Sequence, residues 1–263
     1  MTEENQEHVA LVTGASGGIG EAIARRLARE GCVVILTARE GGRCERIVRG
    51  IRDGGGTAHA LSLDVTDPES VGNAARAANE YGPVDWLVNN AGIAETAPLL
   101  PRRGHDSEAF FRRHLEVNFH GARRMVEAFV PAMVERGAGR VVQIASSAGL
   151  EGYPYASAYC ASKFALVGYT RSAAAELAST GVRFALVCPH YVDTPLLERS
   201  IDRLVRTTGR TREEARAFFA AQNPGGRLVT PEEVADATWE LLSADDPSLC
   251  VELDGGARPG DPG

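Results

Sequence analysis

The start of the chain restricts the fold most strongly. An apolar run, Val9 to Val12, ends in the turn Thr13-Gly14-Ala15-Ser16-Gly17-Gly18-Ile19-Gly20, and a helical pattern follows from Glu21 to Glu30. Gly31 ends this helix, and a second apolar run, Val33 to Leu36, comes next. Strand, glycine turn, helix and strand in this order predict a right-handed βαβ unit, so the chain is expected to fold around a parallel sheet.

The same alternation continues along the chain. Further strands are expected at 58–63, 84–88, 140–144, 182–187 and 249–253, and further helices at 43–52, 68–81, 107–135 (with a break near 116–121) and 159–178. Strands rich in Val, Ile and Leu without polar alternation are typical of a parallel sheet that is buried on both faces. We therefore predict an α/β, doubly wound fold in one domain over residues 1–257, followed by a flexible tail over residues 258–263.

One long connection has no predicted strand. Between Thr194 and Thr230 the sequence predicts two amphipathic helices, 196–204 and 212–222, joined at Thr208-Gly209. Long connections in compact domains are often functional lids, so residues 194–230 are expected to form one. A third helix, 231–242, begins with a Thr cap at Thr230 and a proline at its first position.

Charge and composition exclude several classes of function. The formal net charge of −7 argues against a general nucleic-acid binder or a protein that binds anionic membranes. No apolar run is as long as a membrane span, and Met1 to His8 is polar and acidic, unlike a signal peptide. The five cysteines lack metal-ligand spacing and are expected to be buried thiols in a reducing compartment. These features predict a cytoplasmic protein without a metal site.

The glycine turn has the setting of a phosphate-binding site. It lies between a strand and a helix, where glycines let a pyrophosphate approach and the helix N-terminus supplies N–H donors. The spacing of Gly14, Gly18 and Gly20 differs from Gly-x-Gly-x-x-Gly, and a tight turn without a ligand is the alternative.

The end of the second strand bears on the choice of cofactor. A site for NAD(H) usually has an acidic residue there for the ribose hydroxyl, whereas a site for NADP(H) has an arginine for the phosphate. Arg39 stands at this position and favours NADPH, although Glu40 beside it argues in the other direction. Asp64, after the third strand, is a candidate acceptor for the adenine amine, and Asn89-Asn90-Ala91-Gly92 permits close approach of a ligand or simply makes a turn.

Tyr159 and Lys163 are four residues apart, so they share one face of the expected helix. Alone this spacing is weak. Together with the glycine turn, Asn89 to Gly92, Asn118 and Ser146, it makes the chain resemble the short-chain dehydrogenase/reductase family over roughly residues 8–257. The resemblance implies a seven-stranded Rossmann sheet with helices on both faces and a homotetramer or homodimer. The Tyr159 helix is apolar nearly all round, which also predicts contact with a second subunit.

The resemblance also implies roles for individual residues. Tyr159 would exchange a proton with the substrate oxygen, Lys163 would lower the pKa of the phenol and hold the nicotinamide ribose, and Ser146 would bind the substrate oxygen. Asn118 would hold a proton-relay water. The implied cofactor residues are Gly14, Ser16, Gly18, Ile19, Gly20, Arg39, Asp64, Val65, Asn90, Ala91, Gly92, Tyr159, Lys163, Pro189, Val192 and Thr194.

His190 departs from the family pattern, which has glycine after Pro189. Either it is a tolerated turn residue, or it contacts the substrate or narrows the pocket. With Ser146 and Tyr153 it is a candidate substrate residue. Tyr153 and Tyr155 are expected to form aromatic walls of the pocket, or one of the two is exposed.

The expected reaction is the NADPH-dependent reduction of a ketone. The lid, Arg39 and residues 226–235 resemble ketoreductases of polyketide and fatty-acyl synthesis, whose β-ketoacyl substrate is carried by an acidic carrier protein or coenzyme A. Arginines at 102–103, 112–113 and 206–212 are candidates for contact with that carrier, or are simply solvated. The alternatives are a dehydrogenase of small 3-hydroxy acids, steroids or sugars, and a non-catalytic regulatory protein that binds the cofactor.

Overall fold

A seven-stranded parallel sheet forms the centre of the protein in the computed structural model, which describes residues 8–100, 106–245 and 248–256. The strands lie in the order β3-β2-β1-β4-β5-β6-β7. Their bounds are β1 Val9–Thr13, β2 Val33–Ala38, β3 Thr57–Ser62, β4 Val84–Asn89, β5 Gly139–Ile144, β6 Val182–Pro189 and β7 Cys250–Leu253. The strand order reverses between β1 and β4, so the predicted doubly wound Rossmann sheet is confirmed.

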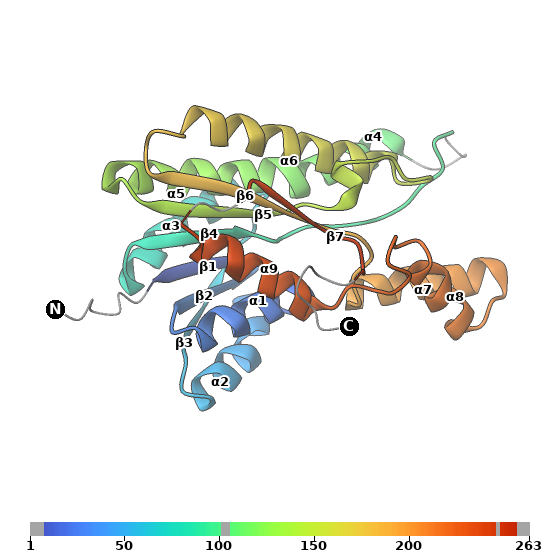
Figure 1. Ribbon diagram of the computed structural model, residues 1–263, viewed down its shortest axis with the longest axis horizontal. Helices are drawn as coiled ribbons and strands as arrows, with labels where there is room; N and C mark the ends of the chain where they lie inside the picture. The colour runs from blue at the N-terminus through green and yellow to red at the C-terminus, as the bar shows by residue number, and fades with distance from the viewer. Residues whose placement is uncertain (1–7, 101–105, 246–247, 257–263) are drawn as a thin grey trace.

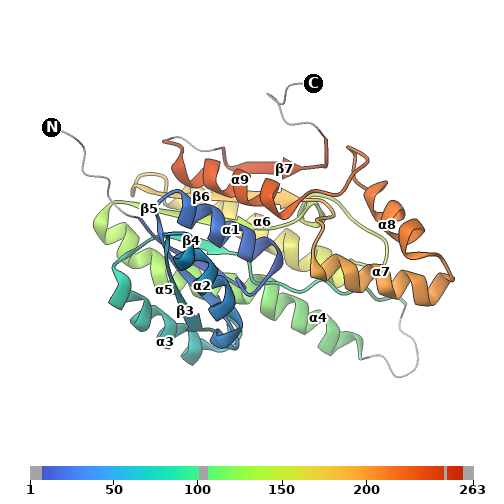
Figure 2. The ribbon, with the colours of Figure 1, turned by 90° about the horizontal axis from the view of Figure 1, so that it is seen from below.

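Helices cover both faces of this sheet (Figure 1). One face carries α1 Gly18–Arg29, α2 Glu45–Asp53 and α9 Pro231–Ser243, and the other carries α3 Pro68–Ala78, α4 Ser107–Leu115, α5 Gly121–Arg136 and α6 Ser157–Glu176. The two helices of the predicted lid, α7 Pro195–Thr208 and α8 Arg212–Ala220, project beyond the sheet (Figure 2). Short 3₁₀ turns occupy 41–44, 79–81 and 147–149.

The core consists of two apolar layers, one on each side of the sheet. In β1, Ala10 and Val12 pack toward α1 and α9, whereas Val9 and Leu11 pack toward α5. Successive side chains of a strand point to opposite faces, so a strand with helices on both sides must be apolar throughout. This is why the unbroken Val, Ile and Leu runs identified the parallel sheet.

The helix ends follow the sequence signals. Thr194, Thr211 and Thr230 cap α7, α8 and α9 with their side chains, and the last two caps are completed by a glutamate at the third helical position. The break expected in the long helix after Ser107 is a π-helical turn, Glu116–His120, which separates α4 from α5. Asn118 lies within this turn, and π-turns often occur at functional sites.

Some expectations need a smaller correction or lie beyond the described residues. The predicted lid helix at 212–222 ends earlier, at Ala220, and the predicted helix at 43–52 begins with a 3₁₀ turn. Residues 258–263, the predicted tail, lie outside the described residues, and the single domain over 1–257 stays a prediction. Among the described helices, none is long and apolar enough to cross a membrane.

Candidate active site

The glycine turn is shaped by contacts that leave no room for side chains. Gly14 and Gly18 have φ of 66° and 56°, in the left-handed region that favours glycine. A β-carbon at Gly20 would lie 2.6 Å from Asn90 Nδ2, whereas one at Gly17 would meet no atom within 4 Å. Gly17 precedes α1 without a side-chain cap. The space in front of the helix N-terminus is therefore open, as a pyrophosphate requires.

Thr13 joins this turn to the end of β4. Its hydroxyl oxygen accepts hydrogen bonds from the backbone N–H groups of Asn90 and Ala91, both at 3.0 Å. The Asn90 side chain in turn donates to the backbone oxygens of Thr13 and Gly14 at 2.9 and 3.1 Å. The predicted cofactor residues after β1 and β4 are thus brought together, while Ser16 is exposed and Ile19 packs against the core.

The expected adenosine end lies at β2 and β3. Glu40, which argued against NADPH, pairs with Arg43 through two contacts of 3.1 and 2.9 Å, whereas Arg39 precedes it on the same exposed segment. Partial burial of Asp64 raises the pKa of its carboxyl group. Hydrogen bonds from Thr66 and the positive charge of Arg39 outweigh this effect, so the pKa of Asp64 lies below its ordinary value. Val65 is buried against Gly121 of α5.

Ser146 and Tyr159 meet at the carboxyl edge of the sheet. Ser146 follows β5, and its hydroxyl accepts a hydrogen bond from Ala148 N at 3.1 Å. Burial raises the pKa of Tyr159 to about 12, and a hydrogen bond with the Ser146 side chain opposes the shift. This direction is opposite to the lowering that we expected from Lys163.

The position of Lys163 explains the difference. Its ammonium donates to Ile144 O at 2.8 Å and lies 5.9 Å from the centroid of the Tyr159 ring. Burial lowers the pKa of Lys163 to about 8. Desolvation disfavours the charged forms of both groups, so the phenol stays protonated and the lysine loses its proton more easily.

Asn118 connects three elements through its side chain. Its Oδ1 accepts from Ile93 N at 2.8 Å, and its Nδ2 donates to Ile93 O and to Ser162 Oγ, both at 2.9 Å. Ser162 Oγ then donates to Tyr159 O at 2.7 Å. The amide therefore holds the segment after Gly92 against the start of α6, and a water relay through Asn118 remains a prediction.

The segment after β6 completes the edge. Thr194 caps α7, and a β-carbon at Gly18 would lie 3.6 Å from Thr194 Cγ2. Val192 bridges to Val229 on the far side of the lid, and Pro189 O accepts from Ser146 Oγ at 3.5 Å. The residues predicted to meet the nicotinamide, Pro189, Val192 and Thr194, thus lie between the glycine turn and Ser146.

Tyr153 is half-buried, whereas the side chain of Tyr155 is 68 % exposed. Of the two aromatic walls considered from the sequence, Tyr153 packs beside Tyr159 and Tyr155 faces solvent. Tyr155 is also the only non-glycine residue with positive φ, 64°, in the described part of the chain.

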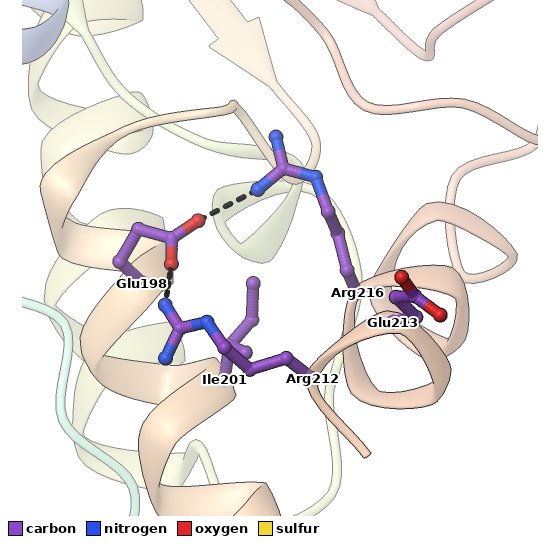
Figure 3. Close-up of a pocket in the computed structure, with 5 residues that line it drawn as sticks. All are labelled: Glu198, Ile201, Arg212, Glu213 and Arg216. Carbon is purple, nitrogen blue, oxygen red and sulfur yellow. Dashed lines mark hydrogen bonds and ion pairs between the residues drawn. The ribbon is translucent and has the colours of Figure 1, made fainter.

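Ion pairs join the two lid helices to each other and to the segment after β6. Glu198 on α7 pairs with both Arg212 and Arg216 on α8, around a cavity of about 100 Å³ that Ile201 and Glu213 also line (Figure 3). Arg216 also pairs with Asp193, and Arg212 with Asp202. Arg203 donates to Thr96 O at 2.8 Å, which ties α7 to the segment after β4. This cavity is too small for a substrate, so we interpret it as a gap in the packing between α7 and α8.

Residues 8–204 match the family model described as short chain dehydrogenase. The chain belongs to this family. It is 38 % identical to cis-4-hydroxycyclohexanecarboxylate dehydrogenase of Sinomonas cyclohexanicum, over 97 % of this chain and 98 % of that protein. It is 39 % identical to a putative ketoacyl reductase of Streptomyces coelicolor, over 92 % of each chain.

A solved structure shares the same fold. A tryptophan variant of actinorhodin polyketide ketoreductase, determined with NADPH, superposes with a TM-score of 0.88 at 34 % identity, covering 96 % of this chain and 97 % of the other. The short-chain dehydrogenase/reductase family predicted from the glycine turn, Ser146, Tyr159 and Lys163 is thereby confirmed.

Three residues at this edge did not stand out in the sequence. Asp193 adjoins a recognised motif, so closer attention to the neighbours of that motif would have found it. Tyr191 and Glu252 carry no local signal, because their roles depend on contacts with residues more than thirty positions away.

Proposed function

We propose that this protein is an NADPH-dependent ketoreductase that reduces a ketone to a secondary alcohol. The observation that carries the proposal is that the Tyr159 phenol lies close enough to the Ser146 side chain for that side chain to lower its pKa, at the sheet edge where the glycine turn and Lys163 also lie. The nicotinamide, when bound, supplies a hydride for the carbonyl carbon. The residues of the chain then have to bind the carbonyl oxygen and provide its proton.

Tyr159 is suited to donate that proton. With a pKa near 12, the phenol is protonated at neutral pH and can donate to an oxygen that gains negative charge. Ser146 lies beside it and stabilises the same oxygen by a second hydrogen bond. Lys163, held at Ile144 O, supplies positive charge beneath the phenol and a donor for a ribose. The protonated phenol is the form that donates in reduction, whereas oxidation needs the phenolate as the proton acceptor, and the raised pKa makes the phenolate scarce at neutral pH.

The choice of NADPH rests on Arg39. A guanidinium can hold a 2′-phosphate through two hydrogen bonds. The carboxylate of Glu40, which would repel a phosphate, is neutralised by its pair with Arg43. The comparison structure determined with NADPH supports the same choice.

The proposed substrate is a β-ketoacyl or polyketide-type ketone, on a carrier protein or coenzyme A. The putative ketoacyl reductase and the polyketide ketoreductase among the similar proteins support this class. The arginines offer less support, because Arg112, Arg113 and Arg212 pair with acids of the chain itself and positions 102–103 lie outside the described residues. A dehydrogenase of a small cyclic or linear hydroxy acid is the second candidate, favoured by the similarity to cis-4-hydroxycyclohexanecarboxylate dehydrogenase.

We also propose a cytoplasmic homo-oligomer. All five cysteines are free thiols, as suits a reducing compartment. On α6, Cys160 and Val167 are buried within the chain, but Phe164 is 46 % exposed on the outer face, where a second copy of the helix can cover it. Light scattering at micromolar concentration tests this: a monomer would contradict it.

The experiment for the reaction is a cofactor assay. The purified protein is incubated with NADPH or NADH and with a β-ketoacyl thioester, acetoacetate or 4-oxocyclohexanecarboxylate, and loss of the reduced nicotinamide absorbance is followed. We expect turnover with NADPH, fastest for the thioester. Faster turnover of the free acids would favour the second candidate, and binding of NADPH without turnover of any ketone would favour a non-catalytic protein.

A further inference from the structure

His190 does not point into open space where a substrate would bind. Its side chain is only 2 % exposed and lies between strand β7 and the segment after β5. The ring Nε2 is 2.7 Å from Glu252 Oε1, and Nδ1 is 3.3 Å from the hydroxyl of Tyr153. A carboxylate can only accept, so Nε2 carries a proton and the ring orientation is determined by Glu252.

Three acceptors surround the hydroxyl of Tyr153, which has one proton to donate to one of them at a time. Glu151 Oε1 lies 2.6 Å from the oxygen, Ser147 Oγ lies 2.9 Å from it, and His190 Nδ1 lies at 3.3 Å. Burial raises the pKa of Tyr153, so this phenol stays neutral and serves as a hydrogen-bonding anchor. Ser147 directly follows the Ser146 that meets Tyr159, and the network therefore borders the reacting groups.

The ring of Tyr153 belongs to a series of aromatic side chains. It packs with Tyr159 against Ala148, Ala156 and Cys160. It also stands edge-on to the Tyr191 ring at 6.3 Å between centroids, and Tyr191 contacts Phe219 of lid helix α8 at 5.1 Å. We call Tyr153, Tyr191 and Phe219 the aromatic wall. It extends from the start of α6 to the lid.

We propose that His190, oriented by Glu252, is a positioning residue that holds Tyr153 in the aromatic wall, and that this wall selects uncharged ketones with a flat ring. The inference rests on the proposed ketoreductase function and specifies its substrate class. It gives His190 an indirect role in the pocket, through Tyr153, in place of the direct substrate contact considered from the sequence.

The chemistry of the wall supports this substrate class. Aromatic side chains prefer edge-to-face or offset contact with other rings, and such contacts add to the burial of apolar surface. The charged partners of the network, Glu151 and Glu252, are both carboxylates, so a substrate carboxylate would be repelled. A tyrosine already held in place loses little further freedom when a ring packs on it, which lowers the cost of binding.

The test compares two ketones across a small set of variants. 1-Tetralone has a flat bicyclic frame that reaches the wall, and butanone fills little more than the space around the carbonyl group. We expect His190→Gly to lower kcat/KM for 1-tetralone about fivefold, mainly through KM, since about one ordinary hydrogen bond is lost. Butanone should change by less than about twofold. Glu252→Gln and Tyr153→Phe should act in the same direction, and His190→Gln should restore part of the loss.

A double variant separates positioning from general destabilisation. If His190 acts through Tyr153, the variant carrying both His190→Gly and Tyr153→Phe should be no worse than the more affected single variant. Tyr155→Phe is the matched control, because Tyr155 is exposed on the same segment. Equal losses for both ketones, or losses that add in the double variant, would overturn the proposal. If His190→Gly does not fold, Tyr153→Phe and Glu252→Gln carry the same comparison.

The proposed function can fail separately. If the wild-type protein reduces no ketone with NADPH, the ketoreductase proposal is wrong. If the wild-type protein is active but prefers acetoacetate to 1-tetralone, or the variants keep its ratio of the two ketones, only the role of the aromatic wall is wrong.

Discussion

The side-chain nitrogen of Asn90 blocks a side chain at Gly20, because a β-carbon placed there would lie only 2.6 Å from Asn90 Nδ2. Gly14 O lies equally close to that position, at 2.6 Å. Neither neighbour can retreat easily, because Asn90 Nδ2 donates to both Thr13 O and Gly14 O. The third glycine of the turn is therefore required by packing between β1, α1 and β4, and the ligand does not have to touch it.

This packing predicts different results for two glycine substitutions. Gly20→Ala should destabilise the fold by about 1–3 kcal/mol through overpacking and should weaken NADPH binding with it. Gly17→Ala should leave the free energy of unfolding nearly unchanged, because its extended φ of 167° suits any residue and its β-carbon meets nothing within 4 Å. Its methyl group would still enter the proposed pyrophosphate space. Thermal unfolding and NADPH titration measure the two effects, and a stable Gly20→Ala with normal affinity would contradict the argument.

The two hydroxyls at the sheet edge should differ in their contributions to turnover. Tyr159→Phe removes the proposed proton donor and should lower kcat by about 10²–10⁴-fold. Ser146→Ala removes one donor to the developing oxygen charge and should cost about 10²-fold. NADPH affinity should change little in either case, which fluorescence titration can verify. A Tyr159→Phe variant with more than about a tenth of wild-type kcat would exclude this residue as the proton donor.

The preference for NADPH over NADH should depend on three charged residues after β2, which are Arg39, Glu40 and Arg43. Arg39→Ser should raise KM for NADPH about tenfold or more and leave KM for NADH nearly unchanged, since the lost contact is to a phosphate. Arg43→Ala leaves Glu40 without its partner and should raise KM for NADPH by about two- to fivefold. Removing the freed carboxylate as well, by Glu40→Gln, should reverse that loss. No reversal would mean that Arg43 acts on the cofactor directly.

The buried ammonium of Lys163 predicts a pH-dependent stability. Its pKa is about 8 in the folded protein, below the ordinary 10.5, so between these values the unfolded chain binds a proton that the folded protein does not. The free energy of unfolding of the cofactor-free protein should therefore rise with pH across this window because of this group. Compared with Lys163→Met, the wild type should gain on the order of 3 kcal/mol between pH 7 and pH 11.

Urea denaturation of both proteins at each pH measures that gain, and groups common to both cancel in the difference. A constant difference across the window would show that Lys163 keeps its proton in the folded protein. Lys163→Met is the control, because it lacks the titrating amine and leaves the other titratable groups of the chain in place.

Local patterns were sufficient to predict the sheet, the helices and most of the residues at its carboxyl edge. Unbroken apolar runs such as Val9 to Val12 predict strands with helices on both faces, and Thr230 followed by Pro231 predicts the start of α9. The carboxyl ends of parallel strands meet at one edge, so residues that follow β1, β4, β5 and β6 had to come together. Asn118 was also found, through its place in the ordered set of motifs.

The protonation states and the hydrogen-bond partners of the site residues could be determined only from the tertiary structure. The spacing of Tyr159 and Lys163 predicts that they share a helix face. In the folded protein, desolvation raises the pKa of Tyr159 and lowers the pKa of Lys163, and the ammonium of Lys163 donates its hydrogen bond to Ile144 O. His190 stands out as a departure in the sequence, yet its partner Glu252 lies 62 positions later. Spacing along a helix is a local property, whereas solvent exclusion and contacts between β6, β7 and the segment after β5 arise only when the whole sheet has formed.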